Sequence, residues 1–310
     1  MKRARTALLA ALVLLAFTQP TLAAPKVVVT IKPLHALVAQ VMAGVANPEI
    51  LVKGFSSPHL YALKPSDIAA LSSADIVFRA SAAVEPFAGK IAQTLPKQVN
   101  VVTLQEAPGV VLFERRSQLS FQTPAEPRPL PTGTSTHTVD GHIWLDPENA
   151  KAMVDRIEQV LSAKDPVHAD SFQRNAIDLK HKLDALSAEL EQQLAPLAGK
   201  PYLVAHDAFQ YLEHRFKLNV VGVISLSPEV APSARRLAEL RRKILALGAI
   251  CVFAEPQFDT RLLDSLTEGT LARTGTLDPE GFSLEPGPNL YFVLMRKLAD
   301  DLRACLLPPA

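Results

Sequence analysis

The chain has 310 residues, of which 48% are hydrophobic and 20% charged, so it is long and apolar enough for two domains with packed cores. Its 32 basic and 31 acidic residues leave a formal net charge of +1. Without a basic excess or a long basic run, the composition favours neither a nucleic-acid partner nor binding to a membrane surface.

The N-terminus has the features of an export signal. Lys2, Arg3 and Arg5 form a positive region, and Thr6–Phe17 is an apolar stretch too short to span a bilayer. Small residues suited to cleavage follow, and no cysteine lies nearby to carry a lipid. We expect residues 1–24 to be a signal peptide and the mature chain to be periplasmic without a lipid anchor. A short membrane anchor is the alternative.

Strands and helices alternate in the region after the signal. The first strand is a continuous β-branched run, which is typical of a strand buried in a parallel sheet. The expected strands are Lys26–Ile31, Glu49–Lys53, Asp75–Arg79 and Val99–Leu104. The expected helices are Pro33–Gly44, Lys64–Ser73 and one that begins near Pro86.

A loop and a long helix separate the two halves of the chain. Residues 114–141 are rich in proline and lack periodicity, which predicts a long exposed loop. Asp146 and Pro147 are a favourable helix cap and first helical residue, so we expect a helix after this loop. Between Pro166 and about Leu194 there is no further proline or glycine, which predicts a helix about 40 Å long.

The second half repeats the alternation. The expected strands are Tyr202–Ala205, Asn219–Ile224, Ile250–Ala254 and Arg273–Leu277, followed by helices that begin near Ala208, Pro232, Thr260 and Asn289. We therefore predict an α/β protein of two lobes, each with a mostly parallel four-stranded sheet and flanking helices, joined by a long backbone helix. The N-terminal lobe would comprise residues 25–165, the linking helix residues 166–195 and the C-terminal lobe residues 196–310.

Three histidines occupy positions where ligands bind in such folds. His59 lies beyond the second expected strand, His206 ends the first strand of the second half, and His142 follows the long loop. Ligands of parallel α/β sheets bind beyond the carboxyl ends of the strands, so these side chains are expected to meet between the lobes. Three imidazoles suit zinc, a borderline-soft ion with tetrahedral preference. For each histidine alone, the alternative is an ordinary hydrogen-bonded loop residue.

Other polar residues are weaker candidates for the same site. Asp278 also follows a strand end and is a further candidate ligand. Glu255 ends a strand and is expected to orient a ligand from behind or to have a structural role. His35 begins a helix after a strand end and is a candidate for a similar outer position or a fourth ligand. His137 lies in the proline-rich loop, where disorder opposes a fixed ligand geometry.

The chain has only two cysteines, Cys251 and Cys305. In an oxidising compartment an isolated pair most simply forms one disulfide. Free thiols or metal ligands are the alternative, although this spacing matches no cysteine-rich zinc motif.

Several segments, taken in order and spacing, carry a family resemblance. They are Thr30–Pro33, Ser57–Asp67, Ala74–Asp75, His142–Pro147, His206–Ala208, Cys251–Gln257 and Gly275–Pro279. Through them, nearly the whole mature chain resembles the periplasmic zinc-binding proteins of bacterial ABC importers, the ZnuA-type members of the metal-binding solute-binding proteins.

This resemblance implies zinc bound between two lobes by His59, His142 and His206, and a disulfide between the two cysteines. It also implies an inner-membrane ABC permease with its cytoplasmic ATPase as partner, an auxiliary periplasmic zinc chaperone as a further one, and a monomeric chain. Manganese-type relatives carry a carboxylate where this chain has His206, which favours zinc. Asp278 matches an aspartate that ligates metal in parts of the family.

The sequence departs from the family pattern at two places. The loop before His142, which is rich in histidine and acidic residues in many zinc-type members, holds only His137 here and is rich in proline. Some relatives place an acidic residue just before the first histidine ligand, whereas this chain has Pro58, whose side chain cannot ligate.

The leading hypothesis is therefore capture of Zn²⁺ and delivery to a permease, without enzymatic chemistry. A manganese or iron receptor of the same fold is one alternative. A secreted zinc hydrolase is another, because three histidines and an open water position also describe catalytic zinc. The chain has neither an H-E-x-x-H motif nor a G-x-S-x-G motif, which disfavours the hydrolase.

Overall fold

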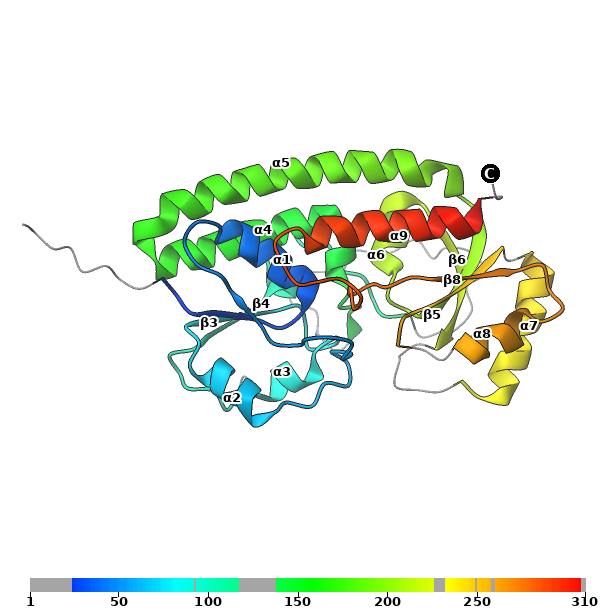
Figure 1. Cartoon of the computed structure of the whole chain (residues 1–310), viewed down its shortest axis with the longest axis horizontal. Helices are drawn as coiled ribbons and strands as arrows, with labels where there is room; N and C mark the ends of the chain where they lie inside the picture. Colours follow the sequence, from blue (N-terminus) through cyan, green and yellow to red (C-terminus); the bar gives the residue numbers. More distant parts are fainter. Residues whose placement is uncertain are drawn as a thin grey trace, which may run out of the picture.

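The computed structural model describes residues 24–91, 93–116, 138–225, 232–248, 250–257 and 260–307. Residues 1–23 of the predicted signal peptide and most of the predicted proline-rich loop, including His137, lie outside these residues. Within them, the strands form two four-stranded sheets that lie side by side beneath a long helix (Figure 1). No helix in this described part is long and apolar enough to cross a bilayer.

The first sheet has the strand order β2-β1-β3-β4, with all pairs parallel. Its elements are β1 (Val27–Val29), α1 (Lys32–Val41), β2 (Glu49–Ile50), α2 (Pro65–Ser72), β3 (Ile76–Arg79), α3 (Pro86–Ile91) and β4 (Asn100–Thr103). Val27 and Val29 pack into a core shared with α1, whereas Val28 packs with Leu71 of α2. Because alternate residues of a strand point to opposite faces, both faces are covered, and this explains the uniformly apolar run.

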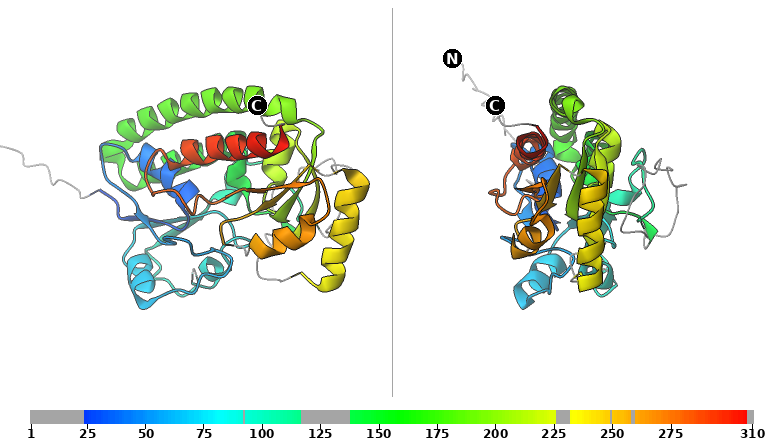
Figure 2. Two further views of the ribbon diagram at one scale, coloured as in Figure 1. Left: turned by 45° about the vertical axis from the view of Figure 1, so that its right-hand side comes forward. Right: turned by 90° about the vertical axis from the view of Figure 1, so that its right-hand side faces the viewer.

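The second sheet repeats this arrangement with the order β6-β5-β7-β8, again with all pairs parallel. Its strands are β5 (Pro201–His206), β6 (Asn219–Ser225), β7 (Cys251–Ala254) and β8 (Arg273–Thr276). Its helices are α6 (Gln210–Phe216), α7 (Ala234–Leu247), α8 (Thr260–Thr267) and α9 (Leu290–Leu306). Leu203 of β5 packs with Leu240 of α7 and Leu263 of α8, which lie on the outer side of the sheet (Figure 2).

The long helix packs along both halves of the molecule. The long helix is α5 (Ala169–Leu194). It follows α4 (Pro147–Lys164), which is capped by the Asp146 side chain, and a 3-10 turn (Pro166–His168) joins the two helices. Seven α5 side chains at helical spacing are buried: Phe172, Ala176, Leu179, Leu183, Leu186, Leu190 and Leu194. They pack on α1 and α4 of the first half and on α9 of the second, so α5 is part of a continuous core (Figure 1).

The predicted fold class is confirmed: two lobes with parallel four-stranded sheets and flanking helices, with a long helix between them. The predicted helix from Pro166 differs only in its first turn, a 3-10 turn in which the His168 backbone N–H donates to the Asp165 carbonyl at 3.3 Å. The disulfide between Cys251 and Cys305 is also present, and it ties β7 to α9.

Candidate metal centre

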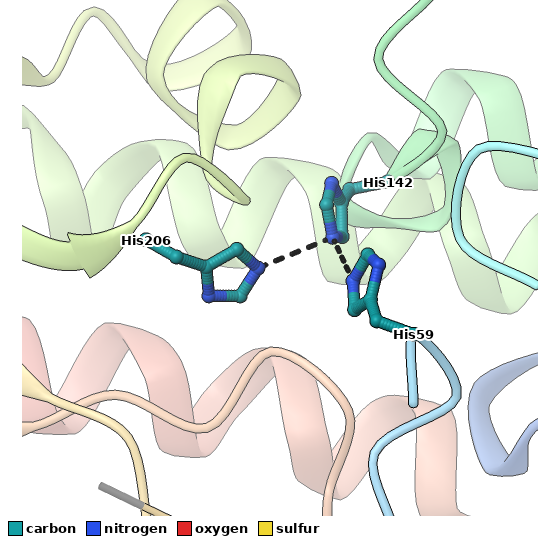
Figure 3. Close-up of side chains that lie close together, drawn as sticks. All are labelled: His59, His142 and His206. Atoms are coloured by element: carbon teal, nitrogen blue, oxygen red, sulfur yellow. Dashed lines mark hydrogen bonds between the residues drawn. The ribbon is translucent and has the colours of Figure 1, made fainter. Parts of the chain in front are cut away.

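Three imidazoles from distant parts of the chain meet at the carboxyl ends of the strands. His206 is the last residue of β5, His59 lies in the loop after β2, and His142 immediately precedes a 3-10 turn (Ile143–Leu145). The Nε2 atom of His142 lies 3.3 Å from Nε2 of His59 and 3.4 Å from Nε2 of His206 (Figure 3). One nitrogen from each ring lies within 4.8 Å of the other two.

This spacing fits a single zinc ion. Zinc–nitrogen bonds of about 2.0–2.1 Å at tetrahedral angles place two ligand nitrogens about 3.3–3.4 Å apart. The His142 nitrogen has this separation from both of its neighbours. The group can therefore hold a metal through three nitrogens.

Each of the three imidazoles also bonds to a hydrogen-bond acceptor outside the cluster. His142 Nδ1 lies 2.7 Å from Oδ1 of Asp140, which also accepts the His142 backbone N–H at 3.0 Å. His206 Nδ1 is paired with Oε1 of Glu255, and His59 bonds to the backbone of Ala83. A proton on Nδ1 that is donated to an acceptor leaves the Nε2 lone pair free for a metal. The three rings are therefore oriented with their Nε2 atoms toward one another.

Burial and neighbouring charge act differently on two of these histidines. Burial lowers the pKa of His59 well below its ordinary value, and the adjacent His142, His206 and Arg115 lower it further. Burial alone would lower the pKa of His206 as well, but the charge and hydrogen bond of Glu255 outweigh it, and the pKa is raised. Protons therefore compete with metal at His206 at a higher pH than at His59.

A family model described as zinc-uptake complex component A, periplasmic, matches residues 27–305. The chain belongs to this family. High-affinity zinc uptake system protein ZnuA of Brucella abortus strain 2308 is 39% identical over 99% of this chain and 99% of that protein. The protein of the same name from Yersinia pestis is 32% identical over 97% of each chain.

Solved structures share the fold of this family. A crystal structure of ZnuA superposes with a TM-score of 0.76 at 23% identity, covering 92% of this chain and 100% of that chain. A Zn(II)-bound mutant variant of AdcAII from Streptococcus pneumoniae superposes with a TM-score of 0.71 at 25% identity, covering 90% of this chain and 99% of that chain. The fold therefore recurs in solved proteins that are only 23% and 25% identical to this chain.

Two residues that the sequence made candidates for the site are engaged elsewhere. Asp278 accepts the backbone N–H groups of Glu280, Gly281 and Ser283, so its carboxylate closes a turn after β8. His35 bonds through Nε2 to the carbonyl of Pro48 at 3.0 Å. Neither belongs to the His59, His142 and His206 group, the metal-capable cluster found in the described residues. His137 lies outside those residues.

Sequence reasoning missed Asp140, although its position two residues before His142 was a usable signal. Gly141, between them, lies so close to the Ser81–Val84 segment that an added Cβ would overlap the Ser81 side chain. The glycine lets the His142 segment lie directly against the segment that supplies Ala83, the partner of His59.

Proposed function

We propose that this chain captures Zn²⁺ between its two lobes with His59, His142 and His206 and delivers it to an ABC permease for zinc uptake. The observation that carries the proposal is the spacing of the Nε2 atoms, 3.3 and 3.4 Å, which matches two edges of a tetrahedral zinc site. Membership of the zinc-uptake family supports the same cargo.

The donor set supports zinc rather than a harder ion. Imidazole nitrogens suit zinc, whereas manganese sites usually include carboxylate oxygens. Glu255 and Asp140 serve as acceptors behind the ligands. In this role Glu255 is not available as the general base of a zinc hydrolase, which supports binding without chemical turnover.

The proposal extends to the processing and partners of the chain. Residues 1–24 act as an export signal that is removed, and the mature chain works in the periplasm as a monomer without a lipid anchor. Residues 25–165 and 196–310 form the lobes on either side of the helical segment 166–195. The mature chain docks on an inner-membrane permease driven by a cytoplasmic ATPase, and an auxiliary periplasmic chaperone loads the site. The names of the relatives, which are components of zinc uptake systems, support the permease partner.

Zinc titration of metal-free protein tests the ligand assignment. Wild-type protein is expected to bind one Zn²⁺, and His59→Ala, His142→Ala and His206→Ala are each expected to bind at least 100-fold more weakly, since each removes one of three ligands. His181→Ala on the exposed side of α5 is the matched control and should bind as wild type does. Wild-type affinity in all three ligand variants would contradict the assignment. Competition with Mn²⁺ at equal concentration distinguishes the two receptor types.

A further inference from the structure

The segment that carries His142 is attached to the second lobe, although it precedes the long helix in the chain. The Tyr211 hydroxyl donates to the Asp140 carbonyl at 2.7 Å, and the Trp144 indole N–H donates to the Pro279 carbonyl at 2.8 Å. The Tyr291 hydroxyl donates to the Trp144 carbonyl at 2.7 Å. Three anchors thus come from α6, from the turn after β8 and from α9.

Gln210 adds a contact that reaches the ligand itself. It is the first residue of α6, four positions after His206, and its side-chain amide is buried. Its Nε2 donates to Oδ2 of Asp140 at 3.2 Å and to the Glu114 carbonyl at 3.0 Å. The opposite carboxylate oxygen, Oδ1, accepts from the His142 ring and backbone. The chain of contacts therefore runs from α6 through Asp140 to the imidazole of His142.

Among the residues that the structure describes, Gln210 supplies the hydrogen bond shown to Oδ2 of Asp140. Asp140 is 4% exposed, so solvent offers Oδ2 little hydration. The Arg116 guanidinium is close, but it pairs with Asp207 at 3.3 Å and with Glu213 at 2.8 Å. A buried carboxylate oxygen that loses its donor rotates toward another one, and this rotation would carry Oδ1 away from His142.

We propose that Gln210 is a positioning residue for zinc binding: from α6 of the second lobe it holds the Asp140 carboxylate, so that His142 of the first lobe and His206 of the second form a preorganised pair of ligands. His59, bonded to Ala83 of the first lobe, is the third ligand and does not belong to this pair. The inference rests on the proposed function, because it assigns Gln210 a part in that zinc site. Nothing in the helix propensity of α6 requires glutamine at this position.

The test compares zinc affinity in wild type, Gln210→Leu, Asp140→Asn and the double variant, each as the full mature chain. Replacing a direct partner of a metal-bound histidine typically costs 10–100-fold in affinity. Since Gln210 acts one bond further away, Gln210→Leu should weaken Zn²⁺ binding about 3–10-fold. Its effect should disappear in the Asp140→Asn background, because the contact it supports is then already altered. Gln210→Met replaces Gln210→Leu if the leucine variant does not fold.

One further readout and one control variant distinguish a positioning role of Gln210 from a general effect on protein stability. Co²⁺ bound in place of zinc absorbs visible light according to its coordination geometry, so its spectrum should change in Gln210→Leu. Gln193→Leu on α5 is the matched control: it also removes a helical amide hydrogen bond, to Glu189, but has no route to a ligand. It should lower thermal stability at most, with unchanged zinc affinity and Co²⁺ spectrum.

The results for Gln210→Leu and Asp140→Asn either support or overturn the positioning role of Gln210. A weaker Kd with a changed Co²⁺ spectrum in Gln210→Leu, both abolished by Asp140→Asn, supports the proposal. Wild-type affinity and spectrum in Gln210→Leu overturn it while leaving the proposed function intact, provided that the histidine variants still lose zinc. An equal loss of affinity in both Asp140 backgrounds also overturns it, because Gln210 would then act independently of Asp140. Failure of the wild type itself to bind zinc defeats both proposals.

Discussion

Replacement of Glu255 should change both the strength of zinc binding and its dependence on pH. Glu255 is 2% exposed and its carboxylate is paired with Nδ1 of His206, which is 3% exposed. Its charge is poorly screened at this depth, so it acts strongly on the imidazole. Glu255→Gln retains an oxygen that can accept the Nδ1 proton but removes the charge, whereas Glu255→Leu removes both.

The size of the effect follows from these two roles. Loss of an acceptor behind a metal-bound histidine costs 10–100-fold in affinity, or about 1.4–2.7 kcal/mol. We expect Glu255→Gln near pH 7.5 to bind Zn²⁺ about 10-fold more weakly and Glu255→Leu about 100-fold more weakly.

Although Glu255→Gln should weaken zinc binding near neutral pH, it should also lower the pH at which acid begins to weaken that binding. In the wild type the raised pKa of His206 lets a proton compete with zinc as soon as the pH falls through that pKa. Without the charge of Glu255, burial lowers the pKa of His206, so the acid loss of affinity should begin at a lower pH in Glu255→Gln.

Competition against a chromophoric chelator between pH 5.5 and 8 measures both effects. Glu191→Gln, which removes an exposed carboxylate on α5, is the matched control and should behave as the wild type. Two results for Glu255→Gln would each refute the role assigned to Glu255. One is a wild-type Kd for zinc at pH 7.5, and the other is an affinity that falls at the same acid pH as in the wild type.

Three further predictions concern stability, each measured by urea unfolding. Burial raises the pKa of Glu85 from 4.5 to about 7. The stability that the protonated carboxyl contributes is therefore full below about pH 4.5 and is lost as the pH rises through 7. Glu85→Gln should flatten the decline of the free energy of unfolding between pH 5 and 8, which amounts to about 3 kcal/mol at most. An unchanged decline would show that Glu85 is not its source. Replacing both Cys251 and Cys305 by alanine opens a link across 54 residues and should cost about 4 kcal/mol; a loss below 1 kcal/mol would contradict the chain-entropy reasoning. Lys32→Met leaves three interlobe carbonyls without their ammonium donor and should cost about 2–4 kcal/mol, and a neutral result would show that water replaces it.

Much of the fold could be predicted because its signals are local. The β-branched run near the start became β1, and the cap and proline at Asp146 and Pro147 began α4 as expected. Strand ends were less accurate. The expected strand Glu49–Lys53 became a strand of two residues, although the backbone N–H groups of Leu51 and Val52 still bond toward β1. At the edge of a sheet one side of the strand has no partner, so its regular pairing ends early.

Local pattern also marked the strand-end histidines, but it marked Asp278 and His35 in the same way. Only the folded structure separated them, since Asp278 bonds to backbone N–H groups of the turn after β8 and His35 to the Pro48 carbonyl. The role of Gln210 arises from its contact with Asp140, 70 residues away, which no local periodicity encodes. The order of residues thus determined the alternation of strands and helices and the places where strands end. The hydrogen-bond partner of each buried polar side chain was decided by the tertiary structure, because a buried polar atom takes the partner that the folded chain brings to it.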